Sequence, residues 1–229
     1  MGIFVQDTFT GGAGLLTSHV GEIGGWSDTS GSTWGFPQNS TSYAKLDGAG
    51  SVYATADDTR RAAIQSDVLS PQMDVYLEMQ INVGASINAL SLKNYLHNSS
   101  TLHGWSGDGG HIIFNDSSST SLYAPYYATG TFETVLPGAA PNDVVTCRFE
   151  YDFTHGAIRA YWNGGLVATW GIYTGNQPIE AGVFAMDMDS FSATTGNGLK
   201  INYLEIGTID PPTAFWTDLT GSLVETIGA

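Results

Sequence analysis

Paired acidic residues are the first feature of the sequence whose spacing could support chemistry. Glu150 and Asp152 lie two residues apart in the run VVTCRFEYDF, and residues two apart on a strand point to the same face. Two carboxyl groups on one face are what glycoside hydrolysis requires, one as the acid and the other as nucleophile or base. Arg148 lies beside this pair in the same run, which favours paired surface charge over catalysis.

A second acidic run, Asp187, Asp189 and Ser190, follows the apolar segment AGVFAM. Its oxygen atoms are ligands of the kind that Ca²⁺ prefers, and the same run equally fits the capped end of a strand. We therefore expect no cofactor, with calcium as the one metal ion for which candidate ligands are at hand.

The histidines and the other nucleophilic residues form no catalytic motif. His97, His103 and His111 would converge only if their loops fold together, and no histidine has the spacing of a zinc site. The sequence contains no GxSxG nucleophile elbow, no phosphate-binding glycine loop and no Cys/His pair typical of a cysteine nucleophile. On these grounds we predict that the protein is not an enzyme.

Aromatic residues close to acidic ones are the best candidates for ligand binding. Sugar sites combine an aromatic ring, which covers the apolar face of a pyranose, with hydrogen-bonding groups nearby. Trp105 with Asp108, in the glycine-rich loop 98–110, fits this description best, and Tyr126 and Tyr127 come next. These four residues are the predicted glycan site.

The elements that must position these residues are β-strands. The run from Val144 to Trp170 reads as two successive hairpins, and Asn163-Gly164 is a dipeptide typical of a tight two-residue turn. Apolar and polar residues alternate in its first strand, and Cys147 falls on the apolar face, so we predict a buried, inert thiol. A second alternating run, residues 73–83, predicts a long central strand.

Composition indicates one large all-β domain. The 229 residues include 29 glycines without a fixed period, 42% are hydrophobic and 13% charged, and no segment carries a sustained helical apolar stripe. The net charge of -15 opposes nucleic-acid binding, which needs basic patches. No signal peptide and no apolar stretch of about 18 residues is present, so we expect neither secretion by a signal nor membrane insertion.

The strand motifs resemble a known family. The runs VYLEMQINV, HIIFN, SLYAPYY, VVTCRFEYDF, AIRAYWNGGLVATW, AGVFAMD and LKINYLEIG are similar to those of the concanavalin A-like lectin/glucanase jelly roll. The opening DTFTGGAGLLTSHVGEIGGW resembles the start of such domains in tailed-phage virion proteins. The resemblance covers roughly residues 3–209. It implies a two-sheet antiparallel jelly-roll sandwich over residues 1–209, and a fold that hosts lectins, hydrolases, lyases and structural modules.

The same resemblance bears on catalysis. Glycosidases of this fold carry two glutamates that flank an aspartate at alternate positions of one strand. Neither Glu150 with Asp152 nor Asp187 with Asp189 reproduces that pattern.

A short C-terminal tail follows the predicted sandwich. Asp210-Pro211-Pro212 ends the last strand, because proline cannot donate to a sheet ladder. Residues 210–229 are nevertheless rich in large apolar side chains, so we expect them to dock on a neighbour or on the domain itself. The residues that would make this contact are Phe215, Trp216, Leu219, Leu223, Val224 and Ile227.

Taken together, these features predict a non-enzymatic phage virion protein, either capsid decoration (cement) or a tail-associated module, to which glycan adhesion could be added. Its expected partners are other virion proteins, further copies of itself and a host surface glycan. It would be made in the host cytoplasm and act in the virion. The alternatives are a carbohydrate-binding lectin module independent of a particle and, ranked below it, a polysaccharide hydrolase or lyase of the same fold.

Overall fold

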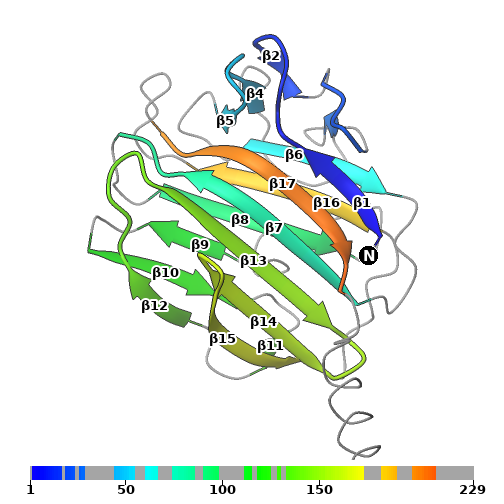
Figure 1. Ribbon diagram of the computed structural model, residues 1–229, viewed down its shortest axis with the longest axis vertical. Coiled ribbons are helices and arrows are strands. Elements are labelled where there is room, and N and C mark those ends of the chain that lie inside the picture. The colour runs from blue at the N-terminus through cyan, green and yellow to red at the C-terminus, as the bar shows by residue number, and fades with distance from the viewer. Residues whose placement is uncertain are drawn as a thin grey trace, which may run out of the picture.

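Two antiparallel β-sheets lie one behind the other in the computed structural model (Figure 1). The structure describes residues 2–16, 19–23, 26–28, 44–54, 60–66, 74–85, 90–97, 111–114, 118–124, 128–129, 133–172, 182–189 and 198–209. No α-helix occurs among them, so the all-β prediction is confirmed. The described residues also contain no helix long and apolar enough to cross a membrane.

The larger sheet holds ten of the described strands, and the first strand pairs with the last one. Its main path runs β11-β15-β14-β13-β7-β17-β5-β4-β2. The strands are β1 (Ile3–Asp7), β2 (Gly14–Leu15), β4 (Ala44–Leu46), β5 (Val52–Ala54), β7 (Val75–Asn82), β11 (Ala128–Thr129), β13 (Val144–Asp152), β14 (Ala157–Trp162), β15 (Gly165–Ile172) and β17 (Lys200–Thr208).

The smaller sheet holds seven of the described strands in the order β12-β10-β9-β8-β16-β6-β3. It lies behind the larger sheet in Figure 1. The strands are β3 (Trp26–Asp28), β6 (Arg60–Ser66), β8 (Leu90–His97), β9 (His111–Phe114), β10 (Ser119–Tyr123), β12 (Glu133–Pro137) and β16 (Gly182–Asp189).

The hydrophobic core draws on both sheets. Every second residue of β13 is buried, as its alternating sequence predicts, and Cys147 has no exposed surface. Leu77 and Met79 of β7 are equally buried, and Ile112 and Leu122 contribute from the smaller sheet. The opposite residues of β7 and β13 therefore form the outer face of the larger sheet.

Two local predictions from the sequence are confirmed. Asn163 and Gly164 both have positive φ, 49° and 80°, which is the backbone of a two-residue type I′ turn between β14 and β15. The apolar residues of the last strand shift phase between Tyr203 and Leu204, which predicts either a bulge or burial on both faces. The pairing of β17 with β7 slips nearby, between Ile201 and Tyr203, as a bulge requires. The predicted tail, residues 210–229, lies outside the described residues.

Candidate functional site

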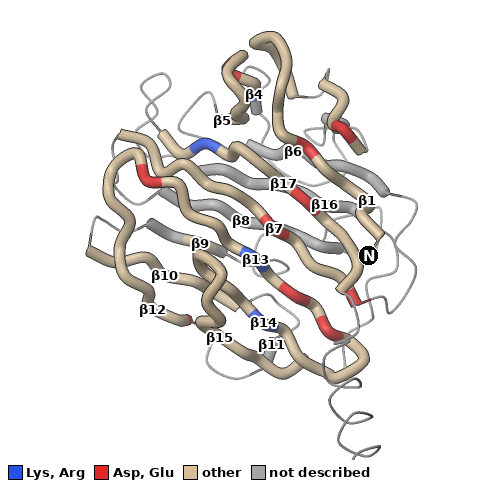
Figure 2. Tube along the Cα trace, in the orientation of Figure 1, with Lys and Arg blue, Asp and Glu red and all other residues tan. Residues whose placement is uncertain are grey.

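A continuous row of polar side chains crosses the outer face of the larger sheet. Gln6 of β1 lies opposite Glu205 of β17, which lies opposite Glu78 of β7. Glu78 in turn lies opposite Arg148 of β13, and Arg148 lies opposite Tyr161 of β14. We call these five residues the polar row. Figure 2 shows acidic segments on β17 and β7 beside a basic one on β13.

Local sequence explains why the row faces solvent. The tripeptide Tyr-Leu-Glu occurs twice, at residues 76–78 in β7 and 203–205 in β17. In both copies the leucine is buried in the core, so the glutamate on its C-terminal side points to the outer face. The two strands are antiparallel, and their pairing sets the two glutamates directly opposite each other.

Glu205 is the most heavily hydrogen-bonded acid of the row. The phenol groups of Tyr76 and Tyr203 both donate to its carboxylate, and Gln6 Nε2 donates to Oε2 at 3.3 Å. Burial and the hydrogen bond to Glu205 raise the pKa of Tyr203 to about 12. Burial, followed by the same acceptor, also raises the pKa of Tyr76, so both phenols remain donors across the physiological range.

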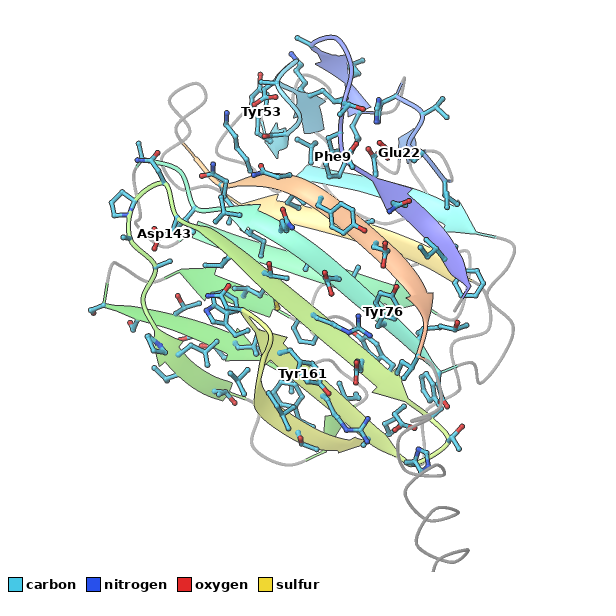
Figure 3. The ribbon with its side chains drawn as sticks, viewed as in Figure 1. Phe9, Glu22, Tyr53, Tyr76, Asp143 and Tyr161 are labelled. Carbon is cyan, nitrogen blue, oxygen red and sulfur yellow. The ribbon has the colours of Figure 1, made fainter. Side chains whose placement is uncertain are left out.

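Arg148 is held in place from three sides. Its Nε donates to Glu150 at 3.0 Å, and its Nη1 lies 3.4 Å from Glu78. Its guanidinium carbon lies 3.7 Å from the centre of the Tyr76 ring, the geometry of a cation–π contact. Figure 3 shows Tyr76 and Tyr161 on the same side of this sheet, on the strands that flank β13.

A small open hollow lies over the middle of the row. Its volume is about 160 Å³, and its lining consists of Glu78, Thr146, Arg148, Tyr161 and Gly164. The side chains of Arg148 and Glu78 are 23% and 28% exposed, so both reach solvent here. The hollow combines carboxylate acceptors, guanidinium donors and an aromatic ring.

Glu150 and Asp152 have different environments, although the sequence places both on the outer face. Glu150 accepts from Arg148 and, at 3.1 Å, from Tyr161, so it supports the polar row. Asp152 is buried, with His155 Nδ1 at 2.8 Å and Arg159 Nη1 at 2.9 Å. It is therefore not the exposed surface charge that the sequence suggested.

The predicted glycan site cannot be compared with the polar row. Trp105, Asp108, Tyr126 and Tyr127 all lie outside the described residues. The same holds for the tail residues of the predicted assembly contact, which are Phe215, Trp216, Leu219, Leu223, Val224 and Ile227.

The predicted calcium ligands are described only by strand pairing. Asp187 stands opposite Lys93 of β8 and Arg61 of β6, and Asp189 stands opposite Ser91. Ser190 lies outside the described residues. Within the described part of the chain, no three acidic, histidine or cysteine residues gather in a group that could hold a metal ion.

Of the three histidines that the sequence could bring together, the two that the structure describes lie apart along their strands. His111 lies opposite Lys93, four residues from His97 along β8, which separates the two strand positions by about 13 Å. His103 lies outside the described residues. A pairing that the sequence did not indicate joins His19 Nε2 to the buried Asp7 at 2.9 Å, and it fastens the segment after β1 to that strand.

Comparisons with known proteins identify the fold. No family model and no curated protein matches the chain. A glycosyl hydrolase family protein from Mycobacterium fortuitum superposes with a TM-score of 0.52 at 16% identity, covering 90% of this chain and 100% of the other. A beta-1,3-glucanase from Mycobacterium marinum gives 0.50 at 14% identity, covering 90% and 98%. The Emp46p carbohydrate recognition domain gives 0.48 at 14% identity, covering 73% and 87%.

The first two of these matches, with TM-scores of 0.52 and 0.50, confirm the two-sheet β-sandwich fold. They contradict the prediction that the protein is not an enzyme, because two solved structures that match most of this chain are named as a glycosyl hydrolase family protein and a glucanase. That prediction relied on the missing motif along one strand, and the structure places acidic residues opposite each other across two strands. The virion role gains no support from these structures and stays a prediction.

Proposed function

We propose that the protein is a carbohydrate-binding β-sandwich and that its sugar site is the polar row. The observation that carries the proposal is the pairing of Glu78 with Glu205 on the open face of a sheet. Like charges directly opposite each other destabilise a sheet. Natural sequences keep such local conflicts mainly at functional sites.

The chemistry of the row suits a polyhydroxylated ligand. Each sugar hydroxyl can donate one hydrogen bond and accept others. The carboxylate of Glu78 would accept from such hydroxyls, and Arg148 would donate to them, since both residues line the hollow. The ring of Tyr161, at the edge of the hollow, would cover the apolar face of a pyranose.

The size of the hollow limits how much of a sugar chain it can hold. Pockets for drug-sized ligands measure roughly 300–1,000 Å³, whereas this hollow measures about 160 Å³. It would hold one sugar unit of a longer chain. Further units would extend along the row towards Glu205 and Gln6, where tyrosine and amide groups continue the polar surface.

Binding can be tested by calorimetry with a panel of neutral oligosaccharides on the wild type and on two variants, Tyr161→Ala and Glu205→Gln. We expect at least one oligosaccharide to bind and both variants to weaken it about tenfold or more, the loss of about one good hydrogen-bonded or stacking contact. Val135→Ala is the matched control, because Val135 is 66% exposed on the smaller sheet. Binding that both site variants leave unchanged would place the sugar site elsewhere.

Hydrolysis of the bound chain is a second candidate function. The two carboxyl groups of a retaining glycosidase lie close together, about 5–5.5 Å apart, and Glu78 and Glu205 stand directly opposite each other on neighbouring strands. Glu205, oriented by three donors, would be the nucleophile and Glu78 the acid. The names of the two hydrolase structures above favour this candidate.

A reducing-sugar assay on β-glucans and related polysaccharides tests the second candidate. Turnover that Glu78→Gln and Glu205→Gln both abolish would support it. Turnover that survives both changes would assign the chemistry to other residues.

A further inference from the structure

We infer that the polar row selects uncharged sugars over uronates, because Arg148 lies among the carboxylates of Glu78, Glu150 and Glu205. This inference rests on the proposed carbohydrate site. It concerns which sugars the site accepts, rather than whether it binds sugar at all.

The guanidinium of Arg148 is held in a fixed position. Glu150, Glu78 and the Tyr76 ring contact its guanidinium at 3.0 Å, 3.4 Å and 3.7 Å, the last measured from Cζ to the ring centre. A guanidinium is planar and presents its N–H groups as a rigid fork. Because three partners fix that plane, the guanidinium has one defined orientation beside the hollow that Arg148 lines.

Part of the Arg148 guanidinium remains available to a ligand. Arg148 lines the hollow and its side chain is 23% exposed. Nε and Nη1 are engaged by carboxylates. Within the described part of the chain, the Nη2 group has no hydrogen-bond partner, so its two N–H groups, together with the second N–H of Nη1, are left for ligand oxygens.

The groups around the Arg148 guanidinium are mainly negatively charged. Three carboxylates, Glu78, Glu150 and Glu205, share the face with Arg148. The nearby Arg159 is already engaged by Asp152 at 2.9 Å and lies 3.9 Å from Glu150. The row therefore carries more negative than positive charge, and the carboxylate of a uronate would meet repulsion there.

A neutral sugar meets no such penalty. Its hydroxyl oxygen can accept from Nη2 of Arg148, and its hydroxyl hydrogen can be donated to Glu78, since both residues line the hollow. A single sugar hydroxyl can therefore accept from the cationic guanidinium and donate to an anionic carboxylate. A carboxylate lacks the hydrogen that these acidic residues require.

The test uses two probes that differ only at C6. One is the neutral gluco-oligosaccharide that binds best in the panel, and the other is the same oligosaccharide with its C6 hydroxymethyl groups oxidised to carboxylates. We expect the wild type to prefer the neutral probe by about tenfold or more, which corresponds to about 1.4 kcal/mol. Equal or tighter binding of the oxidised probe would overturn the inference.

Variants separate specificity from folding. Arg148→Lys keeps the charge but loses the planar fork, and we expect it to weaken the neutral probe about tenfold. Glu78→Gln removes one repelling charge, and we expect it to narrow the gap between the probes. Arg159→Lys is the matched control, because Arg159 lies on the same face but does not line the hollow. It should change neither the affinity for the neutral probe nor the difference in affinity between the two probes.

The wild type alone provides a further check that needs no variant. Salt screens repulsion between exposed charges, so raising the salt concentration should narrow the preference for the neutral probe. A preference that salt leaves unchanged would contradict the charge argument. If neither probe binds at all, the proposed carbohydrate site fails; if both bind equally, only the selectivity fails.

Discussion

The ring of Tyr76 lies against the backbone of Gly207 on the neighbouring strand. The two residues are direct partners in the pairing of β7 with β17, and a Cβ atom on Gly207 would lie 2.8 Å from the phenolic oxygen. This close approach lets the Tyr76 phenol reach Glu205 while the ring supports Arg148. Glycine at position 207 is therefore part of how the polar row is held.

Gly207→Ala should destabilise the protein and weaken the polar row. The new methyl group would also lie 2.9 Å from the carbonyl oxygen of Gly2, so it cannot be relieved by the tyrosine alone. We expect a loss of about 1–3 kcal/mol in the free energy of unfolding by urea, typical of overpacking. Gly12→Ala is the control, since nothing lies within 4 Å of its Cβ, and an equal loss in both variants would contradict the explanation.

The hairpins and long strands were predictable because local patterns encode them. Alternation in β13 and the Asn163-Gly164 turn depend on neighbours in sequence, and the structure confirms both. The pairing of Glu78 with Glu205 depends instead on which strands become neighbours, which alternation does not specify. The sequence therefore indicated a carboxylate pair along one strand, Glu150 with Asp152, and did not indicate the pair across two strands, Glu78 with Glu205.

One sequence signal could have pointed to the row. The repeated Tyr-Leu-Glu of residues 76–78 and 203–205 places a tyrosine and a glutamate on the outer face of two strands. Pairing those strands brings both phenols to one carboxylate, that of Glu205. Without the strand order, however, the repeat is only two half-buried strands with similar sequences.

The ionisation of Tyr203 should depend on Glu205. Burial and the Glu205 carboxylate raise the pKa of Tyr203 to about 12, from an unfolded value of about 10. A raised pKa favours the neutral phenol in the fold, so this stabilisation is complete below pH of about 10 and lost as the pH rises through 12. Ultraviolet titration of tyrosinate should show Tyr203 ionising at lower pH in Glu205→Gln.

The Tyr203 signal is isolated by subtracting the titration of Tyr203→Phe. If that variant removes a group that ionises near pH 10, the hydrogen bond to Glu205 does not control the phenol.

Asp152 should contribute stability that acid removes. Its burial raises the pKa, but hydrogen bonds from His155 and Arg159 outweigh burial and hold the pKa of Asp152 below its ordinary value. A lowered pKa favours the carboxylate in the fold, so the contribution is present above the unfolded value of about 3.9 and is lost as the pH falls through the folded value. Asp152→Asn should therefore be less stable than the wild type at pH 7, by urea unfolding.

The difference between the two proteins should shrink as the pH is lowered below about 4, where the Asp152 carboxylate becomes protonated first in the unfolded chain and then, at lower pH, in the fold. A difference that stays constant down to acid pH would show that Asp152 acts by shape rather than by charge.

Cys147 should resist thiol reagents until the protein unfolds. The side chain has no exposed surface, and burial, reinforced by the nearby Glu78, raises the pKa of its thiol. Only the thiolate reacts, so labelling should follow the unfolding transition in urea. Rapid labelling in native buffer would contradict the placement of β13 in the core.

The turn between β14 and β15 offers a paired comparison of two adjacent glycines. Gly164 has a φ of 80° with nothing within 4 Å of its Cβ position, whereas Gly165 has no such φ and only the Trp162 carbonyl oxygen at 3.6 Å. Alanine at residue 164 would be forced into the left-handed region, which costs about 1–2 kcal/mol. Alanine at residue 165 meets no such strain and removes backbone freedom from the unfolded chain.

Gly164→Ala should therefore lower the free energy of unfolding by about 1–2 kcal/mol, while Gly165→Ala leaves it unchanged or slightly raised, both measured by urea denaturation. Because Gly164 also lines the hollow between Arg148 and Tyr161, its variant should weaken binding of the neutral oligosaccharide as well. Equal stability of the two variants would mean that the turn adopts another backbone conformation. A loss of stability without a change in affinity would show that the turn is not part of the sugar site.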